Sequence, residues 1–545
     1  MGARSYFDRR LKALDTEWSS FEGQMREISD WLDPRGGRFT PSDVNKGDKK
    51  HFRIINNKAA VAKRVATSGF FAGTMSPSRP WFKLEKIDKD LMASTAVQQW
   101  LFETEEIIRG ILTVSNFYSM APTMLGQLLM YGTCAMSHVD NFNKVAKFFT
   151  HAIGSYRIAV GADGEVDTFV LRKRMTARQL VEEFGIDNVS EAAKRAYELE
   201  KRKDDWFDVV QFIEPNPKEN DKALDSKFKK FRSVWYQPDN TNPDQFLREK
   251  GFAEFPVYVI RFAITGEDIY GTECPGMVAL GDVRALQEEE RQKALGTAKQ
   301  MAPVLKGPGA LRDAKINNMA NSLVIYDNDG DDEGLTPVYE VAVPYNEMRI
   351  DIQAVEKRID EAFFVDLFKA ISSMQGVQPR NQLELSQRNG EALLQLGPAL
   401  GRVQREFLNK VLERTFNQAA AGDLLPEAPE ELVDAELDTR FISSIAQAQK
   451  SEDVTNLENY LLFAEKLAAI KPSAIDKINE DGALDGYAQM TGVIPGINKD
   501  ADTVAAEREA RANAEAQAGH LENEQKRASA NVQDASADKM RSEIE

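Results

Sequence analysis

Two long helical patterns that enclose a short segment rich in glycine, proline and β-prone residues constrain the fold more than any other feature of the chain. The first helix is predicted from Pro275 to Met301, and the second begins near Tyr345 and ends near Ile371. At about 1.5 Å per residue, each helix would reach roughly 35 to 40 Å. A pair this long has too little surface around it to fold alone, so its apolar faces need identical neighbours, which suggests a ring.

The apolar residues of both helices recur at helical spacing, so that each helix has one apolar face. They are Leu280, Val283, Leu286, Ala294, Leu295 and Ala298 in the first helix, and Ile352, Val355, Ile359, Ala362, Phe363 and Ile371 in the second.

The segment between the two helices, residues 302–345, is predicted to be a small β tip. Prolines and glycines between positions 303 and 309 end the first helix, and the β-prone runs 322–326 and 335–339 lie on either side of an acidic turn, DNDGDDEG. This turn does not fit a calcium loop, because glycine falls at its fourth position and Val338 stands where the loop needs a glutamate. A solvated turn is the preferred interpretation.

Length and charge limit the class of protein. At 545 residues the chain is too large for one ordinary core, so two or more domains are expected. A formal net charge of −17 argues against a protein that binds nucleic acid over its whole surface. It is compatible with DNA that only passes through the protein. Cys134 and Cys274 have neither metal-ligand nor disulfide spacing, so buried free thiols and a reducing cytoplasm are expected.

Neither a secretion signal nor a membrane span is predicted. The N-terminal residues carry charge throughout and lack an apolar core. Residues 110–139 carry no formal charge, but serine, asparagine, glutamine and proline interrupt the stretch repeatedly. Buried helices in a soluble core are the better interpretation of that stretch.

The remaining chain predicts a mainly helical α+β fold. Residues 1–155 are expected to be a helical lobe, and residues 156–274 an α+β lobe with strands at 156–160, 166–171, 207–213, 231–236 and 256–262. A helix inserted in this lobe begins with a capping box at Thr176 and Gln179 and runs to about Lys201. After the second long helix come a polar loop and another long helix, which has Leu396, Leu400, Val403, Phe407 and Val411 on one face.

Signals of catalysis are weak. The four histidines lie far apart and form no metal-binding spacing, and the chain contains no GxxxxGK[ST] phosphate loop. We therefore expect neither enzymatic activity nor a bound metal or cofactor.

The order of these parts resembles the portal, or head-to-tail connector, proteins of short-tailed bacteriophages over nearly the whole chain. The stretch VAKRVATSGFFAGTMSPSRPWFKL is similar to that family's apolar helix and its Ser-Pro-x-x-Pro-Trp-Phe turn, here Ser76, Pro77, Pro80, Trp81 and Phe82. Similar family segments are NFYSMAPTMLGQLLMYGTCAM, EALLQLGPALGRVQREFLNKVLERTF and IKPSAIDKINEDGALDGYAQMTGV. One departure is the sequence NQLE at 381–384, where family members often have a Thr-Ala-Thr-Glu-like sequence.

The resemblance implies a division of the chain into named parts. Residues 1–274 and 389–440 would form the wing, 275–301 and 346–371 the two stem helices, and 302–345 the clip. Residues 372–388 would be a tunnel loop that projects into the channel, and 441–501 the crown. The tail, 502–545, is either a helix against a neighbour or disordered.

The same resemblance implies candidate contact residues. The tunnel loop would touch DNA through polar side chains with one cation, which do not read bases: Gln375, Gln378, Arg380, Asn381 and Gln382. Lys293 and Lys299 either line the channel or pair with acidic residues of a neighbouring subunit. The candidate partner-binding residues of the clip are Asn317, Asn318, Asp327 and Asp329.

The partners implied are a ring of identical subunits, usually twelve, and double-stranded DNA in its channel without sequence specificity. The clip would meet the packaging terminase and later the tail adaptor, and the ring would sit in the major capsid or scaffolding protein at one capsid vertex of the virion, after assembly in the host cytoplasm. No membrane partner is expected. One alternative is a helical scaffold or adaptor without a DNA channel, but such a protein gives no reason for the polar loop. A second alternative, a packaging enzyme, would need an ATP site, and none is visible in the sequence.

Overall fold

The structure is a computed structural model of the chain. It describes residues 4–40, 53–85, 95–141, 143–220, 222, 225–303, 305–306, 336–337, 342–373, 395–429 and 438–441, and further on 457, 460–467, 471, 478–479, 481–484, 487, 503–514 and 517. The chain divides into two compact units. Unit 1 comprises residues 1–83, 103–427 and 439–449, and unit 2 comprises residues 84–102, 428–438 and 450–545.

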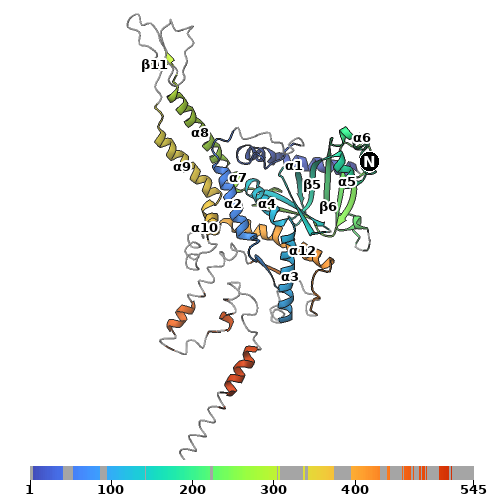
Figure 1. The fold of residues 1–545 in the computed structure, drawn as a ribbon, viewed down its shortest axis with the longest axis vertical. Helices are drawn as coiled ribbons and strands as arrows, with labels where there is room; N and C mark the ends of the chain where they lie inside the picture. The colour runs from blue at the N-terminus through green and yellow to red at the C-terminus, as the bar shows by residue number, and fades with distance from the viewer. Residues whose placement is uncertain are drawn as a thin grey trace, which may run out of the picture. The chain divides into compact units, whose positions relative to one another are not determined.

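The largest sheet of unit 1 is antiparallel, with five strands in the order β4-β5-β6-β7-β8. Its strands are β4 (Tyr156–Val160), β5 (Val166–Thr176), β6 (Trp206–Pro215), β7 (Phe231–Tyr236) and β8 (Arg248–Phe252). Helix α1 (Arg4–Trp31) lies along this sheet (Figure 1) and buries Phe7, Leu11 and Leu14 against Phe212 and Tyr236. The burial of these large apolar side chains stabilises the packing of α1 on the sheet.

The other face of the sheet is only partly covered. Helices α5 (Ala177–Phe184) and α6 (Glu191–Glu198) pack there, and Leu180 of α5 and Val189 of the segment between the helices are buried against Val209. The predicted capping box is confirmed, because Thr176 and Gln179 each bond the other's backbone N–H. The prediction of one helix to Lys201 is wrong, since Gly185 adopts a φ of +84° that ends α5, and α6 begins anew after its N-cap Ser190.

A second, three-stranded sheet has the order β3-β2-β9, formed by β2 (Thr133–Asn141), β3 (Val145–His151) and β9 (Val257–Arg261). Helix α4 (Phe117–Tyr131) precedes it and ends at Gly132, whose φ of +70° is left-handed. The prediction that residues 1–155 form a helical lobe is therefore wrong from residue 133 onward, where β2 and β3 are strands. The uncharged run 110–139 begins in α3 (Thr95–Val114), continues through α4 and ends in strand β2.

The predicted pair of long helices is present. Helix α7 (Pro275–Val278) leads into α8 (Leu280–Met301), and α9 (Tyr345–Ala362) runs back beside it (Figure 1). Tyr345, at the start of α9, donates its hydroxyl hydrogen to Gln300 at the end of α8 over 2.6 Å, which fixes the pair as antiparallel. Strands β10 (Leu305–Lys306) and β11 (Thr336–Pro337) pair between them. The predicted run 322–326 lies outside the described residues, as does the acidic turn.

The second long helix is shorter than predicted. Phe364 has a φ of +53°, which no right-handed helix contains, so α9 ends at Ala362 and a separate helix, α10 (Val365–Ser373), follows. Phe363 and Phe368 are fully buried on the two sides of this break. Their burial stabilises the change of direction between α9 and α10.

The remaining described elements complete unit 1 and its boundaries with unit 2. They are α2 (Lys58–Met75), β1 (Phe82–Glu85), η2 (Glu200–Arg202), η3 (Ser226–Phe228), the π-helical turn η5 (Gln404–Leu408), α12 (Asn409–Ala421) and β12 (Asp438–Phe441). Residues 395–403 are also helical, so that they, η5 and α12 form the predicted long helix after the loop.

Candidate functional site

The base of the α8–α9 pair is fixed to the segment before α2. Gln287 of α8 is 3% exposed, and its Oε1 accepts the backbone N–H groups of Ile55 and Asn56 over 2.6 and 2.8 Å. Its Nε2 donates in return to the carbonyl of Asn56 over 2.9 Å. Because one buried amide satisfies three backbone groups, the attachment fixes position and direction together.

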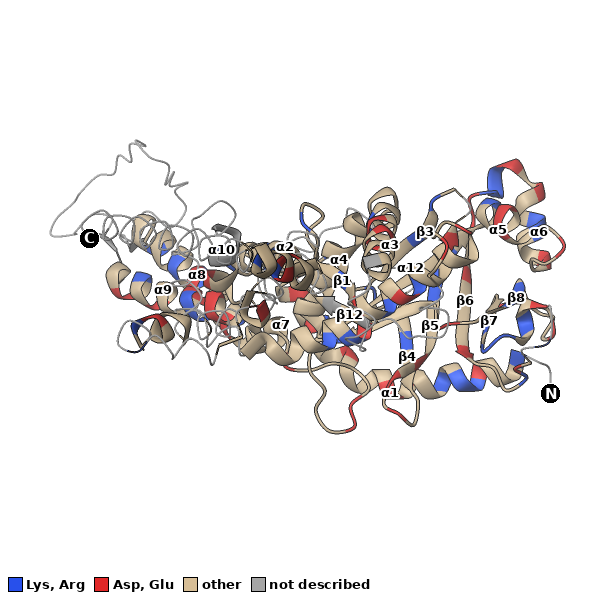
Figure 2. Ribbon diagram, turned by 90° about the horizontal axis from the view of Figure 1, so that it is seen from below, with Lys and Arg blue, Asp and Glu red and all other residues tan. Residues whose placement is uncertain are grey.

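Ion pairs reinforce this base. Arg358 of α9 contacts Asp282 of α8 over 2.8 Å, and Lys58 at the start of α2 contacts Asp360 of α9 over 2.5 Å. Figure 2 shows both signs of charge along α8 and α9. Three helices are therefore joined near the body of unit 1, where Val283, Leu286, Ile352, Val355 and Ile359 form the buried face between them.

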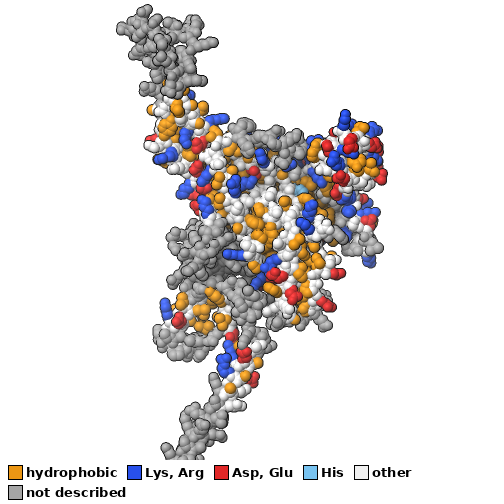
Figure 3. Space-filling view, viewed as in Figure 1, with side chains coloured by type: hydrophobic (Ala, Val, Ile, Leu, Met, Phe, Trp, Pro, Cys, Tyr) orange, Lys and Arg blue, Asp and Glu red, His pale blue; other side chains and the backbone are white. Residues whose placement is uncertain are grey.

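The far half of the pair exposes apolar side chains. Leu295 is 55% exposed, Ile350 61% and Met301 82%. Ala294 and Ala298 of the predicted apolar face are exposed as well. Hydrophobic side chains are visible on this part of the surface in Figure 3. The sequence pattern correctly placed Ala294, Leu295 and Ala298 on one helix, but a single copy of the chain does not cover them. Met301 of α8 and Ile350 of α9 were not part of the predicted apolar faces.

The two basic residues predicted on α8 lie in this far half. Lys293 contacts Glu290 of its own helix over 3.3 Å, with its side chain 40% exposed. Lys299 is exposed near the end of α8. The pairing of Lys293 within its own helix is an alternative that the sequence analysis did not weigh, although the spacing of three residues permits it.

The other predicted contact residues lie outside the described residues. They are Gln375, Gln378, Arg380, Asn381 and Gln382 of the polar loop, and Asn317, Asn318, Asp327 and Asp329 of the tip. The structure does describe the elements that precede and follow the loop.

Before the loop, α10 packs closely on α2. A Cβ atom built on Gly69 would lie 2.4 Å from the Cβ of Phe368, so only glycine permits this approach. The ring of Phe368 also lies 6.0 Å from that of Phe70.

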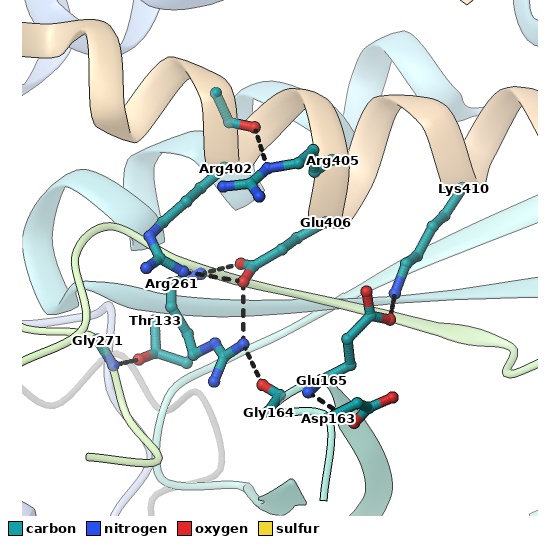
Figure 4. Close-up of polar contacts among 11 residues, drawn as sticks. Thr133, Asp163, Gly164, Glu165, Arg261, Gly271, Arg402, Arg405, Glu406 and Lys410 are labelled. Atoms are coloured by element: carbon teal, nitrogen blue, oxygen red, sulfur yellow. Dashed lines mark hydrogen bonds and ion pairs between the residues drawn. The ribbon is translucent and has the colours of Figure 1, made fainter. Parts of the chain in front are cut away.

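After the loop, the long helix is held by its π-helical turn. Glu406 in η5 accepts the backbone N–H of Arg261 over 2.9 Å and contacts its guanidinium over 3.0 Å, as Figure 4 shows. Arg261 also donates to the carbonyl of Gly164 over 3.0 Å, and Arg402 lies 3.3 Å from the same carboxylate. The side chain of Arg261 is 5% exposed and that of Glu406 17%. A buried pair of this kind needs such additional hydrogen bonds to offset its desolvation.

Comparisons with known proteins show the family to which the chain belongs. The family described as "Bacteriophage head to tail connecting protein" matches residues 4–497. The chain belongs to this family. It is 36% identical to "Portal protein" of Salmonella phage epsilon15 over 504 residues, which cover 92% of this chain and 90% of the relative. It is 33% identical to "Probable portal protein" of Bordetella phage BPP-1 over 508 residues, with the same two coverages.

The Ser-Pro-x-x-Pro-Trp-Phe turn of this connecting protein contributes to its core. Trp81 and Phe82 are 1% and 0% exposed, and the indole N–H of Trp81 donates to the hydroxyl of Tyr118 over 3.2 Å. Burial, partly opposed by that hydrogen bond, raises the pKa of Tyr118. Trp81 and Phe82 of the motif therefore fix the exit from α2.

Two of the connecting protein's histidines are shielded from solvent, His138 fully and His151 partly. His138 contacts the hydroxyl of Tyr258 over 2.6 Å and Gln418 over 2.8 Å, and burial followed by the charge of Arg414 lowers its pKa to about 3. His151 contacts the hydroxyl of Ser137 over 2.6 Å, and burial followed by the charge of Lys173 lowers its pKa to about 4. Both imidazoles are therefore neutral at physiological pH. His138 is a hydrogen-bonding core residue, whereas His151 also lines a cleft of unit 1.

The cysteines are free and buried, as predicted. Burial raises the pKa of the Cys274 thiol to about 12 and that of Cys134 further, so neither is a ready nucleophile. Within the described ranges, no group of three or more His, Cys, Asp or Glu side chains is placed to hold a metal. None of the described helices is long and apolar enough to span a membrane.

The sequence analysis missed Gln287, Arg261 and Glu406, the residues that fix the connecting protein's long helices. Their partners are distant in the chain: Gln287 bonds a segment 231 residues earlier, and Glu406 a strand 145 residues earlier. A weak signal existed for Gln287, a polar residue beside Leu286 on the face that carries Val283.

Proposed function

We propose that the chain is the subunit of a ring-shaped portal at one vertex of a phage capsid, with usually twelve copies around a channel for double-stranded DNA. The genome is packaged and later ejected through this channel. The observation that carries the proposal is the α8–α9 pair, which is rigidly fixed at its base and exposes Leu295, Ile350 and Met301 further out. A head-to-tail contact repeated by rotation closes into a ring and covers such a surface in every copy.

Each part of the chain is proposed to form one part of the portal subunit. Residues 275–301 and 346–371 form the stem, 302–345 the clip, 1–274 and 389–440 the wing, 441–501 the crown, and 502–545 a terminal tail. Helix α10 follows the break at Phe364 and runs to Ser373, into the first residues of the proposed tunnel loop, 372–388. This helix, and not a continuous stem helix, therefore leads to the proposed loop. The close packing of Gly69 on Phe368 and the contacts of Glu406 support a loop whose two flanking helices are both fixed.

The loop is proposed to touch DNA through Gln375, Gln378, Arg380, Asn381 and Gln382 without reading bases. An acidic chain suits a conduit, because a net charge of −17 per subunit disfavours tight adhesion of phosphates to the ring as a whole. Lys293 contributes a weak basic ring at most, since Glu290 neutralises it within its own helix.

The clip, with Asn317, Asn318, Asp327 and Asp329 as its candidate contacts, is proposed to bind the packaging terminase and then the tail adaptor. The wing is proposed to lie in the shell of major capsid or scaffolding protein, and assembly takes place in the host cytoplasm. In this role the chain is a structural component, and the packaging terminase drives the DNA into the capsid. The rival of a helical scaffold without a DNA channel does not account for family membership over residues 4–497.

The experiment that tests the DNA role uses phage particles assembled with a chain that lacks residues 376–382. Packaging density and retention of DNA are expected to fall, while ring formation is preserved. Unchanged density and retention would refute the assignment of the tunnel loop. Lys293→Glu is the matched test on α8: a change in packaging with intact rings would place Lys293 in the channel wall, and no change is expected from its pairing with Glu290.

A further inference from the structure

Unit 1 contains a cleft of about 1030 Å³ between its two sheets. Its floor is the face of the five-stranded sheet that α1 does not cover. Strand register places Leu171, Gln211, Trp235 and Arg248 in one row across that face, and Ile213, Ser233 and Lys250 in the next. Ser137 and Phe149 of the three-stranded sheet and the end of α12 form the opposite wall.

The cleft is cationic in an acidic chain. The basic residues that line it are Arg38, Arg172, Lys173, Lys229, Arg248, Lys250 and Arg414, and the acidic ones are Asp140, Glu183 and Glu254. The side chain of Arg172 pairs with Asp15 of α1, so its charge does not count toward the cleft. Each of the three acids already contacts an arginine of the cleft, because Arg248 pairs with Glu183 and Arg414 with Asp140 and Glu254. The cleft therefore has an excess of positive charge, whereas the whole chain carries −17.

Four of these cations remain available. Among the described residues, no ion pair involves Arg38, Lys173, Lys229 or Lys250. Lys173 lies with its ammonium group 4.6 Å from the centre of the Trp235 ring, and burial lowers its pKa. The charge of Glu183 opposes this shift only in part, so the half-buried ammonium group of Lys173 would gain from a further anionic ligand.

Apolar surface accompanies the charge. Phe149 and Val139, which both line the cleft, are 43% and 38% exposed. Trp235 and Phe252 add aromatic surface at the floor and rim. The site thus offers both cations and apolar contacts, a combination that suits an amphipathic anion.

The recess favours polypeptide over duplex DNA. A duplex carries its phosphates on the outside of a stiff rod, so it meets cations on open surfaces. Lys173 is half-buried on the floor between the two sheets, where the side chains of an entering chain segment can reach it, and the exposed Lys229 and Lys250 line the same cleft. Glutamate and aspartate side chains extend from such a segment and can carry neighbouring apolar residues with them.

We propose that this cleft binds a carboxylate-rich polypeptide segment of a partner protein, with Lys173, Lys229 and Lys250 contacting its carboxylates and Trp235 and Phe149 contacting an apolar side chain. The proposal adds a docking site on the α+β lobe that is separate from the helical pair and from the polar loop.

The test uses the full chain and a short fluorescein-labelled peptide rich in glutamate with leucine at its centre. Binding is measured by fluorescence anisotropy at physiological salt. The double variant Lys229→Glu/Lys250→Glu reverses two exposed side chains of the cleft, so it is not expected to disturb folding. It should weaken binding at least about tenfold. The control Lys12→Glu/Lys201→Glu makes the same change of charge at exposed positions away from the cleft and should leave binding within about twofold.

Three results would overturn the proposal. Equal weakening by the cleft and control variants would show attraction by overall charge alone. In the second result, a short DNA duplex displaces the peptide from the native chain. If that duplex also bound the native chain but not the cleft variant, the cleft would be a nucleic-acid site. Loss of self-association in the cleft variant, measured as native mass, would make it a contact between copies of this chain. A second variant, Trp235→Ala, should weaken the leucine-containing peptide more than a peptide of glutamate alone; equal weakening of both would contradict the apolar part of the site.

Discussion

Glu406 joins the long helix to strand β9 through Arg261, accepting its backbone N–H over 2.9 Å and contacting its guanidinium over 3.0 Å. The π-helical turn gives the helix an extra residue at this point, and Glu406 lies inside that turn. A single carboxylate thereby fixes the helix that follows the polar loop to a strand that leads toward α7 and α8.

Replacing Glu406 by glutamine should destabilise unit 1 by about 3 kcal/mol, because the buried guanidinium of Arg261 loses its counter-charge. The measurement is the shift of the urea unfolding midpoint. The matched control is Glu165→Gln, which removes the pair of Glu165 with Lys410, whose side chains are 64% and 37% exposed. That pair should contribute less than about 1 kcal/mol. Equal losses of unfolding free energy in the two variants would show that the buried pair of Glu406 with Arg261 stabilises the fold no more than the exposed pair does.

Gly69→Ala should destabilise the packing of α10 on α2 by about 1 to 3 kcal/mol, since the new methyl group would overlap the side chain of Phe368. Gly281→Ala in α8 is the control, because nothing lies within 4 Å of the added atom there. It should be neutral or stabilising by up to about 1 kcal/mol, the difference in helix propensity. Thermal unfolding of both variants measures the contrast, and a stable Gly69→Ala protein would contradict the packing described.

Stability should fall as pH decreases below about 6.5, where an unfolded histidine takes up a proton. His151 has its pKa lowered to about 4 in the folded chain, so the unfolded state binds the extra proton between these two values and is favoured there. The loss should reach about 2 kcal/mol between pH 7 and pH 5 for this one group. Urea midpoints at both pH values measure it in the native chain and in His151→Gln. The variant should lose less on acidification; an identical pH dependence would show that His151 does not titrate as described.

Leu295→Asp and Ile350→Asp should weaken self-association at least about tenfold while leaving the unfolding midpoint of the single chain nearly unchanged, because both side chains are exposed in one copy. Sedimentation velocity over a range of concentrations measures the association. Ser19→Asp on the exposed side of α1 adds the same charge elsewhere and should have no effect. Intact rings in both stem variants would mean that another surface joins the subunits.

Local signals explain what could be predicted from the sequence. Pro275 and the turn residues after Met301 fixed the limits of the first long helix, and the capping box at Thr176 marked the start of α5. The strands of the α+β lobe were recognisable from their runs of β-prone residues, although β8 was not found. The Ser-Pro-x-x-Pro-Trp-Phe turn was one of the segments that carried the resemblance to the family, and Trp81 and Phe82 of this turn lie in the core.

Distant contacts explain what could not be predicted. Residues 133–139 are apolar enough for a buried helix, and pairing with β9, more than a hundred residues later, makes them a strand. No local signal announces the left-handed Phe364, which depends on burial of the residues around it. The apolar stripe on α8 was correct as a pattern, but only part of it is buried within one copy, and the same pattern could not tell an internal face from a surface for another subunit.

The central claim, that the chain closes into a ring around a channel, is tested most directly by electron microscopy and native mass measurement on the purified chain. The account predicts rings of about twelve subunits with an axial hole. A monomer or a small closed dimer at micromolar concentration, unchanged when capsid or scaffolding protein is added, would contradict it.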